Sequence, residues 1–503
     1  MKKILFILAA AVITAVSCEK SFEVTNTGNP SGEDMAAKVE ADPSFMYSYV
    51  SGFYSWLVTP GKGTGGHDDY GYLSVMMNLE YMGHDIAMNG TQNWGVYDYQ
   101  HDYGLDEWAR VYEPWSCFFT LINKCNEVID FIPADQEPES ATIKGYLGQA
   151  YALRAFAYTN LMLIFQDPVD ENGNFRLDAP AVPLVYAGRD SVDPDLAQER
   201  QGRNTYALVM EHIEENLALA LEYLDGYQRT SKMEVDYSVA QGIAARYYLF
   251  SQQWEKAAEA AEIAAQGYDI MDKARLYSGF MDVDDPEVMW GFNHTTETQT
   301  TYASFFSHMS NYSPGYSGIG QMIKCIDKDL YDQIPATDFR KGLFNTEAGN
   351  PSASQEGGKY PYASMKFGYD SQWCQDYLYM RAAEMYLIKA EALARTGANA
   401  DAAAAMKPLM QKRDLGYTKN SVTVEDVLLQ RRIELWGEGF VYFDMRRNAL
   451  DCIRVYEGSN HPEWARKNYP AHDASWNYMI PKREVQENQW IEEEDQNPWT
   501  SGV

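Results

Sequence analysis

The strongest helical pattern of the chain lies in residues 376–447. Within it, Tyr386, Ala390 and Leu393 recur at spacings of four and three residues, which places them on one face of a helix. Gly397 interrupts this face, and a second apolar face with smaller side chains follows it. A bulky face on one helix that meets a small face on the next is typical of tetratricopeptide repeats. The stretch therefore predicts a helix–turn–helix pair of that type.

Two earlier regions, about 105–165 and 205–268, carry the same kind of pattern. In the second, Ala245, Trp254 and Ala261 stand where tetratricopeptide repeats place core residues. Together the three regions predict about four helix pairs, scattered along the chain and not in tandem. The predicted fold class is therefore mainly α, with a tetratricopeptide-like helical repeat scaffold.

Periodicity is weak in two regions, about 45–104 and 269–375, which are rich in glycine and aromatic residues. Residues 287–293 (EVMWGFN) are the clearest candidate for a short strand. A long irregular insertion inside a helical array is typical of a binding region. We therefore expect long irregular loops and a few short strands beside the scaffold, with ligand contacts in these two regions.

The N-terminus predicts export and lipidation. Residues 1–17 begin with two lysines after the initial methionine and continue as a short apolar run, typical of a secretory signal and too short to remain as a membrane span. The run ends in Ser17-Cys18, as in a bacterial lipobox, which predicts that Cys18 carries several acyl chains and anchors the protein. An ordinary signal peptide followed by a chance cysteine is the alternative. Residues 18–40 are polar and without pattern, so they are predicted to form a flexible tether.

The chain is strongly acidic. Its 41 lysine and arginine residues face 72 aspartate and glutamate residues, for a formal charge of −31. Such a surface repels phosphate backbones and anionic lipid headgroups. The composition therefore argues against nucleic acid as a partner, and against membrane binding by surface charge alone.

Motifs of catalysis, cofactor binding and metal binding are missing from the sequence. It has no H-E-x-x-H, G-x-S-x-G or P-loop, and its six cysteines show no zinc spacing. Gly61, Gly63 and Gly66 match G-x-G-x-x-G, but HDDY follows where a nucleotide site needs an apolar helix, so we predict a loop. No catalytic residue, cofactor or metal is predicted, and the cysteines after Cys18 are expected to be buried free thiols. A carboxylate pair suited to glycoside hydrolysis stays open, because 72 acids make close pairs common.

Aromatic residues with polar neighbours gather in the two irregular regions. Sugars present apolar C–H faces and hydroxyl edges, so their sites combine flat rings with amides, carboxylates or guanidinium groups. This mixture occurs in residues 89–103 and 302–316. The candidate ligand-binding residues are Asn93, Trp94, Tyr97, Tyr99, Asn311, Tyr312 and Tyr316. For each ring, packing in the core is the alternative.

Two stretches resemble the C-terminal half of the SusD/RagB family: RAAEMYLIKAEALARTG (381–397) and LLQRRIELWGEGFVYFDMRR (428–447). GYLGQAYALRAFAYTNLMLIF (145–165) is similar to the first repeat helix of that family, and the end of the chain is similar to its terminal motif. The chain departs from the pattern at 166–204, where a much longer segment replaces a short loop rich in glycine and proline. The resemblance therefore extends over most of the chain.

Members of this family are surface lipoproteins that capture nutrients for a TonB-dependent outer-membrane transporter. The resemblance implies one SusD-like domain over residues 41–503, anchored through Cys18 on the extracellular side of the outer membrane. It also implies that the charges of residues 431–447 form a buried ion-pair network. The predicted function is non-catalytic binding of an oligosaccharide, with a peptide as the second choice, and delivery of this ligand to a SusC-like transporter.

Two other functions fit the sequence. The first is a surface enzyme that degrades glycans, which product formation from a glycan panel would reveal. The second is a repeat scaffold that binds only proteins. In that case, replacing Trp94 and Tyr312 by alanine would leave every small-ligand affinity unchanged.

Overall fold

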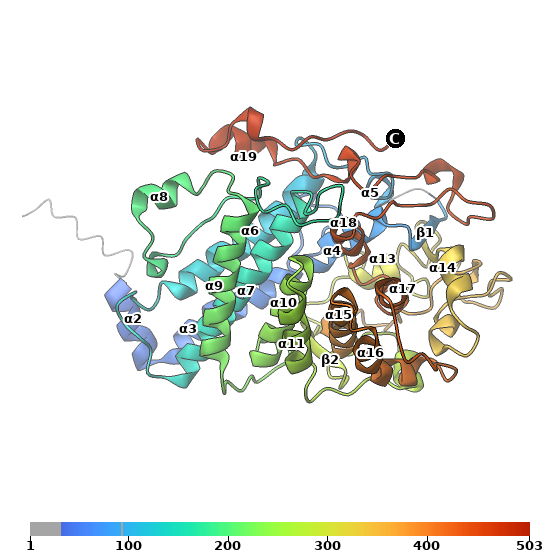
Figure 1. Cartoon of the computed structure of the whole chain (residues 1–503), viewed down its shortest axis with the longest axis horizontal. Coiled ribbons are helices and arrows are strands. Elements are labelled where there is room, and N and C mark those ends of the chain that lie inside the picture. The colour runs from blue at the N-terminus through green and yellow to red at the C-terminus, as the bar shows by residue number, and fades with distance from the viewer. Residues whose placement is uncertain (1–31, 92–93) are drawn as a thin grey trace, which may run out of the picture.

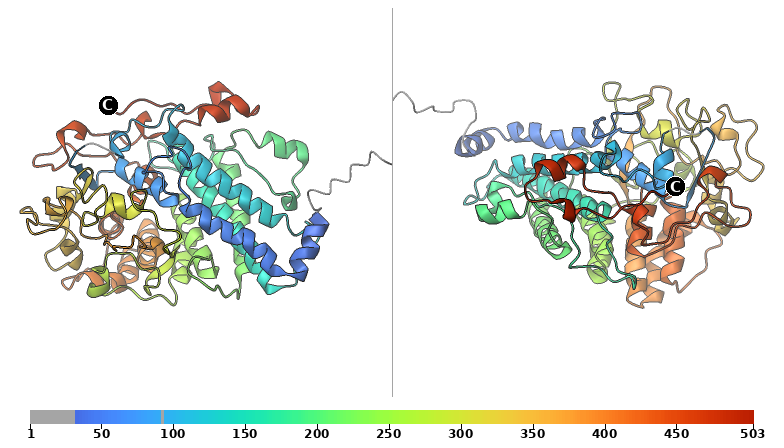
Figure 2. Two further views of the ribbon diagram at one scale, coloured as in Figure 1. Left: turned by 180° about the vertical axis from the view of Figure 1, so that it is seen from behind. Right: turned by 90° about the horizontal axis from the view of Figure 1, so that it is seen from above.

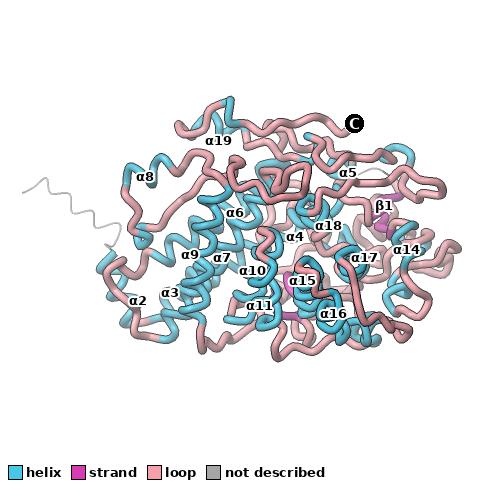
Figure 3. The backbone as a smooth tube through the Cα atoms, viewed as in Figure 1, coloured by secondary structure: helices cyan, strands magenta, loops and turns pink. Residues whose placement is uncertain are grey.

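A computed structural model of the chain describes residues 32–91 and 94–503 (Figure 1). The predicted signal segment, Cys18 and the first part of the predicted tether lie outside the described residues. The regular structure is mostly helical, which confirms the predicted fold class. Figure 3 shows the long helices side by side, while loops gather beyond α17 and along the side that carries the C-terminus.

The N-terminal part of the described chain corrects one prediction. Residues 32–40, expected to belong to a flexible tether, lie in helix α2 (Gly32–Ala41), which packs on α3 (Pro43–Val58). The side chain of Val39 is fully buried, and Asp42 caps α3 by accepting a hydrogen bond from the backbone N–H of Ser44 (3.0 Å). One buried apolar residue and one helix cap hold this segment against the scaffold. Two such residues do not make a recognisable helical pattern, so the helix could not be predicted from the sequence.

The long helices form the scaffold. They are α6 (Ala109–Ile129), α7 (Ala141–Ile164), α9 (Tyr206–Leu224), α10 (Tyr237–Phe250), α11 (Trp254–Ala264), α15 (Ala382–Arg395), α16 (Asn399–Arg413), α17 (Val424–Glu434) and α18 (Val441–Arg447). Helix α7 packs between α6 and α9, α10 pairs with α11, α11 packs on α15, and α15 packs on α16 and α17. Helix α3 packs on α6 and α7, and Figure 2 shows it as the long blue helix beside them.

Shorter elements lie in the connections. The helices are α4 (Tyr72–Met82), α5 (Val96–Tyr99), α8 (Pro194–Glu199), α12 (Lys273–Leu276), α13 (Phe305–Met309), α14 (Lys328–Gln333) and α19 (Lys482–Glu487). The 3₁₀ turns are η1 (Gly188–Asp190), η2 (Phe339–Leu343), η3 (Gly357–Lys359), η4 (Glu463–Ala465), η5 (Ala474–Trp476) and η6 (Glu493–Asp495). Most of these elements position loops and do not belong to the helix pairs.

Small residues let the helices approach closely. A Cβ atom at Gly148 of α7 would lie 2.6 Å from Cγ of Leu224 and 3.2 Å from the carbonyl oxygen of Ala220, both on α9. The first distance is shorter than any relaxed carbon–carbon contact. The pattern of small faces against bulky faces, expected from the sequence, therefore sets the spacing between α7 and α9.

Two small antiparallel sheets connect the irregular regions. Strand β1 (Ile86–Asn89) pairs with β3 (Ile323–Ile326), and β2 (Val288–Phe292) pairs with β4 (Tyr377–Arg381). The predicted strand at residues 287–293 is confirmed by β2. The β1–β3 pairing links two parts of the chain that lie more than 200 residues apart and fixes the loops at its ends.

The charged residues of the last helices form a buried ion-pair network, as predicted. Glu434 contacts Arg413 (2.9 Å, Nε to Oε2) and Arg381 (3.2 Å, Nη1 to Oε1). Burial alone would raise the pKa of Glu434, but these guanidinium groups hold it well below its usual value. A second group on α15, α17 and α18 comprises Glu391, Arg431, Asp444 and Arg447. The charges therefore join the last helices from within.

The cysteines after Cys18 are free thiols, as expected from the sequence. The cysteines at 117, 125, 325, 374 and 452 are free, and all but Cys374, which is half-buried, have no significant exposed surface. Within residues 32–91 and 94–503, no helix combines the length and the hydropathy that a membrane span needs.

Candidate ligand-binding site

The β1–β3 pairing brings the two irregular regions into contact. Trp94 follows β1 and Tyr316 precedes β3, so the antiparallel register, with Asn89 opposite Ile323, places both side chains at the same end of the small sheet. Their ring centroids lie 5.9 Å apart, with an angle of 69° between the planes. Both residues were predicted site residues, and the structure brings them together.

More rings from other loops join this pair and form an aromatic cluster. Its members are His67, Trp94, Tyr302, Tyr316, Tyr369 and Trp373. Tyr302 lies nearly parallel to His67, with centroids 6.3 Å apart and 9° between the planes, and 6.4 Å from Trp373. Tyr302 is 44% exposed, His67 is exposed, and the other rings are half-buried. The cluster is therefore a set of ring faces and edges at the protein surface.

A turn that folds back on α13 holds Tyr316. Ser304 caps α13 by accepting a hydrogen bond from the backbone N–H of Ser307 (3.2 Å). The backbone N–H of Tyr316 donates to Oγ of Ser307 (3.2 Å), and a Cβ at Gly315 would lie 2.5 Å from Cα of Ser307. Only glycine permits this approach, and the Tyr316 hydroxyl then lies 2.6 Å from Nδ1 of His67.

His308 supports the cluster from the inside. Its Nε2 donates a hydrogen bond to the carbonyl oxygen of His67 (2.9 Å), and its ring lies 5.1 Å from that of Tyr316. Burial lowers the pKa of His308 to about 3, so the imidazole is neutral at neutral pH. Nδ1 of His308 and Nε1 of Trp94 have no hydrogen-bond partner among the described residues. Buried polar atoms without a partner are rare, and a water molecule or a ligand hydroxyl is the kind of group each of them would take.

Trp373 has a backbone conformation that residues other than glycine seldom adopt. Its φ angle is +58°, in the left-handed region, which costs on the order of 1 kcal/mol or more. Asp370 stabilises the turn, because its carboxylate accepts hydrogen bonds from the backbone N–H groups of Gln372 (2.9 Å) and Cys374 (3.3 Å). The indole is thus fixed beside Tyr302 by the turn and not by core packing.

The glycine-rich loop beside the cluster wraps around one carboxylate. Asp69 accepts hydrogen bonds from the backbone N–H groups of Lys62 (3.0 Å), Gly63 (2.8 Å) and Gly65 (3.2 Å). An anion therefore already occupies the centre of the loop and would repel a phosphate group. The prediction that the G-x-G-x-x-G motif is a loop agrees with this arrangement.

A buried acidic group lies behind the cluster. Arg110 of α6 forms ion pairs with Asp68, Asp98 and Glu113, and all four side chains are at most 6% exposed. Burial raises the pKa of Asp98 to about 6 and that of Glu113 to about 8. These carboxylates face Arg110 and not the surface. Among the described residues, no group of three or more His, Cys, Asp or Glu side chains is arranged to hold a metal ion.

Two predicted site residues lie in the interior, and the predictions for them are corrected. Tyr99 is fully buried: its hydroxyl is hydrogen-bonded to His461, and the guanidinium of Arg454 lies 4.0 Å from its ring centroid. Asn311 is also fully buried, and its amide bonds the backbone of Lys324 and the carbonyl oxygen of Ser364. Both have the right chemistry for a ligand, but tertiary packing uses it internally.

Two further predicted residues, Tyr97 and Tyr312, are described by the structure and do not belong to the cluster. Tyr97 is 51% exposed, and its ring lies 5.3 Å from that of Tyr103, with 52° between the planes. Tyr312 is half-buried and lies against Gly358. Asn93 lies outside the described residues. Whether these three residues contact a ligand stays a prediction.

Sequence reasoning missed four members of the cluster: His67, Tyr302, Tyr369 and Trp373. Tyr302 stood at the edge of a stretch already singled out, and His67 opens the HDDYGY wording. Trp373 and Tyr369 lie in the second irregular region, without a polar aromatic motif of their own. All four share one feature, an aromatic side chain in a segment without periodicity. Many other residues of the chain have this feature, so it could not distinguish these four as site residues.

Similarity to known proteins agrees with this architecture. A family profile described as "SusD family" matches residues 348–500, and one described as "Starch-binding associating with outer membrane" matches residues 69–249. A SusD-like protein, P38 of Formosa agariphila, is 22% identical over 398 residues, which cover 68% of this chain and 73% of that protein.

Solved structures show the same fold. A SusD-like carbohydrate binding protein from Bacteroides vulgatus superposes with a TM-score of 0.76 at 24% identity, over 92% of this chain and 99% of its own. Surface glycan-binding protein A from Bacteroides uniformis superposes with a TM-score of 0.65 at 18% identity, over 90% of this chain and 99% of its own.

Fold and site together define a tetratricopeptide-like helical protein that presents aromatic rings on irregular loops. The profile matches, the relatives and the solved structures all point to one group of such proteins. The chain belongs to the SusD/RagB family.

Proposed function

We propose that this protein binds a glycan, in the form of an oligosaccharide, at the aromatic cluster and delivers it unchanged to a SusC-like TonB-dependent transporter. One observation carries the proposal: rings from loops far apart in the sequence meet at the surface, and Tyr302 and His67 are exposed there. A peptide is the second ligand class. The proposal needs no chemical step.

The cluster has the chemistry that a sugar requires. The apolar C–H faces of a pyranose stack on aromatic rings, while its hydroxyls need directional partners. His67 and Tyr316 supply polar atoms within the cluster, and the half-buried indoles supply ring surface. A shallow exposed site gives modest affinity, which suits a protein that must release its ligand.

The proposed location is the extracellular side of the outer membrane, with Cys18 as the lipid anchor. The description of the profile that matches residues 69–249 names association with the outer membrane. The acidic charge of −31 would not attach the protein to anionic lipids, so a lipid anchor supplies the attachment.

Calorimetry with a glycan panel tests the ligand proposal. The purified protein should bind at least one oligosaccharide derived from starch, laminarin, mannan or xylan. Trp94→Ala and Trp373→Ala should each weaken that binding about tenfold, which corresponds to ~1.4 kcal/mol. Tyr248→Ala is the matched control, because Tyr248 is a half-buried ring on α10 outside the cluster. Equal affinity in all three variants would place the site elsewhere.

The same panel separates the rival functions. Release of shorter products, abolished by one carboxylate substitution, would identify a glycan-degrading enzyme. If every glycan and peptide fails to bind while the protein captures another protein, a protein-binding scaffold is the better description. Co-purification of the full-length protein from outer membranes in mild detergent should recover a TonB-dependent transporter, and its absence from the eluate would contradict the delivery step.

A further inference from the structure

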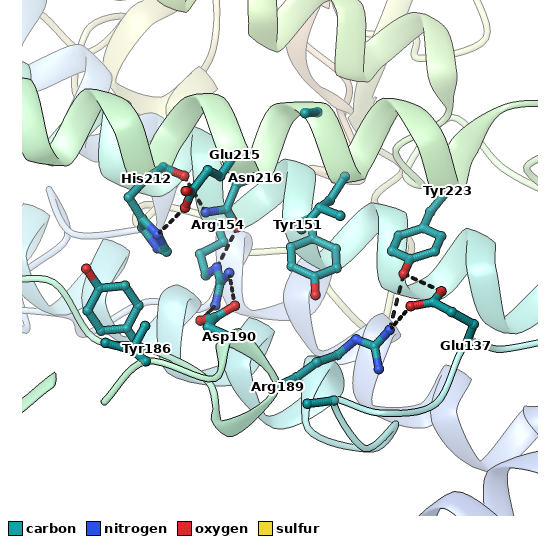
Figure 4. A pocket seen from close by; sticks show the side chains of 14 residues that line it. Glu137, Tyr151, Arg154, Tyr186, Arg189, Asp190, His212, Glu215, Asn216 and Tyr223 are labelled. Carbon is teal, nitrogen blue, oxygen red and sulfur yellow. Dashed lines mark hydrogen bonds and ion pairs between the residues drawn. The ribbon is translucent and has the colours of Figure 1, made fainter. Parts of the chain in front are cut away.

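A cavity of about 600 Å³ lies far from the aromatic cluster, between α7, α9 and the residues around η1 (Figure 4). Cavities of roughly 300–1,000 Å³ are typical of sites for small molecules. None of its lining residues belongs to the aromatic cluster, and in Figure 1 α9 lies in the left half of the molecule whereas α13 lies in the right half. The cavity therefore calls for an explanation of its own.

The segment 166–204, longer than the family pattern, builds one wall. Asp190 of η1 is pinned to α7 because its carboxylate accepts hydrogen bonds from Nη1 (2.8 Å) and Nη2 (2.9 Å) of Arg154. Arg189 is pinned to the turn after α6, where its guanidinium donates to the carbonyl oxygens of Ile132 (3.2 Å) and Gln136 (2.8 Å). These contacts hold the wall in place, so the cavity exists before any ligand arrives.

Aromatic rings line both ends of the cavity. At one end the rings of Tyr151 and Tyr223 are stacked, 6.0 Å apart with 20° between their planes. At the other end, the ring of Tyr186 lies 5.0 Å from that of His212, at an angle of 76°. Figure 4 shows these side chains facing one another from α7, α9 and the segment around η1. Ring surface is thus available along the length of the cavity.

Several polar groups that line the cavity have no hydrogen-bond partner within residues 32–91 and 94–503. The hydroxyls of Tyr151 and Tyr186 have no hydrogen-bond partner among the described residues, although they line the cavity. His212 is only 4% exposed, and its Nε2 has no partner in the described part of the chain. An unpaired buried nitrogen costs free energy unless a ligand or water meets it, and here it belongs to a residue of the cavity wall.

The charges of the cavity favour a neutral ligand. Arg154 is compensated by Asp190, and Arg189 by Glu137 (2.9 Å, Nη2 to Oε1). Neither guanidinium is free to bind a phosphate or a carboxylate, and the additional carboxylate of Glu215 would repel an anion. Ring faces, free hydroxyls and paired charges are the combination that a sugar takes.

We infer that this cavity is a second binding site, which takes a short neutral oligosaccharide. It adds to the proposed function and does not depend on the aromatic cluster. A second site on another face would let one protein hold two parts of the same long glycan, which raises the effective affinity through multivalency.

Titration calorimetry of the purified full-length protein with maltotriose, cellotriose, laminaritriose and mannotriose tests the inference. In the background of Trp94→Ala with Trp373→Ala, one trisaccharide should still bind. Ala218→Trp should weaken this residual binding at least tenfold, because Ala218 is an exposed residue of the cavity wall and the indole would fill the space. Tyr186→Ala should do the same by removing a ring, whereas Tyr248→Ala should have no effect.

The outcomes separate the two sites. Residual binding that ignores both Ala218→Trp and Tyr186→Ala, or the loss of all trisaccharide binding in the double-tryptophan background, would overturn the second site. If the tryptophan substitutions have no effect but Ala218→Trp abolishes binding, the cavity stands and the aromatic cluster is rejected. Thermal unfolding of each variant shows whether it is folded. Because Ala218 is exposed, its substitution is expected to change the stability little.

Discussion

Asn311 and Tyr302 lie nine positions apart, yet their side chains do opposite things. The amide of Asn311 joins the turn after α13 to β3: its Nδ2 donates to the carbonyl oxygen of Lys324 (2.8 Å), and its Oδ1 accepts from the backbone N–H of the same residue (3.1 Å). Tyr302, in contrast, is exposed and makes only ring contacts. One residue builds the site and the other is free to contact a ligand.

Asn311→Ala should therefore lower the free energy of unfolding by on the order of 3 kcal/mol, because several buried backbone groups lose their hydrogen-bond partners. Tyr302→Ala should leave the free energy of unfolding within about 0.5 kcal/mol of the wild-type value and weaken glycan binding instead. Chemical denaturation and calorimetry on the same preparations measure the two quantities. A stable Asn311→Ala protein with normal unfolding would contradict the structural role of this amide.

Lys324 on β3 has no exposed surface, and its Nζ donates to the carbonyl oxygen of Met322 (2.7 Å). Burial lowers the pKa of Lys324 to about 7. Between pH 7 and about 10, the unfolded chain binds a proton at this residue and the folded protein does not. The free energy of unfolding should therefore rise with pH in this window, by up to about 1.4 kcal/mol per pH unit from this group.

Lys324→Met should remove that slope and should stabilise the protein most at and below pH 7, where the charged lysine is most costly in the fold. Denaturant unfolding of both proteins at several pH values between about 6 and 10 measures the difference. Lys407→Met, at an exposed lysine of α16, is the control and should run parallel to the wild type. If the stability of Lys324→Met changes with pH as that of the wild type does, Lys324 is not buried as described.

At the scale of elements, the spacing between α7 and α9 depends on the absence of a side chain. Gly148 lies at their contact, while Gly52 of α3 has open space around the position of a Cβ. Alanine normally stabilises a helix interior by up to about 1 kcal/mol relative to glycine. The two glycines therefore test whether tertiary packing overrides helix propensity.

Gly52→Ala should raise the thermal unfolding midpoint slightly, whereas Gly148→Ala should lower it. The added methyl group at residue 148 pushes against Leu224, and overpacking of this kind costs about 1–3 kcal/mol. Differential scanning calorimetry compares the two variants directly. A rise in both midpoints would show that α9 can move away at little cost.

At the scale of the whole molecule, attachment and folding are separate questions. The segment before α2 carries the predicted anchor, and the described helices begin at Gly32. Cys18→Ala should shift the protein from the membrane fraction to the soluble fraction, because several acyl chains at Cys18 supply the attachment. Fractionation followed by immunoblotting measures this, with Cys374→Ala as the control. Retention of the Cys18→Ala protein in the membrane would contradict the anchor.

The helical repeats could be predicted from the sequence because each helix pair repeats a local pattern. Tyr386, Ala390 and Leu393 identify a helical face by spacing alone, and the strand at 287–293 follows from its composition. The candidate site could be predicted only in part. Trp94 and Tyr316 were predicted and belong to the aromatic cluster. Tyr99 and Asn311 come from the same two aromatic, polar stretches of the sequence, but their side chains are buried.

The helical scaffold, the acidic charge and the two loop-rich regions follow from residues that are neighbours along the chain, so they could be predicted without a structure. Which rings come together at the surface depends instead on contacts between distant segments, and these became visible in the folded protein. The β1–β3 pairing joins segments more than 200 residues apart, and whether a side chain contacts solvent or core depends on that distant partner. The cavity beside η1 has the same origin, because its walls come from helices and a long connection whose spacing no local pattern records.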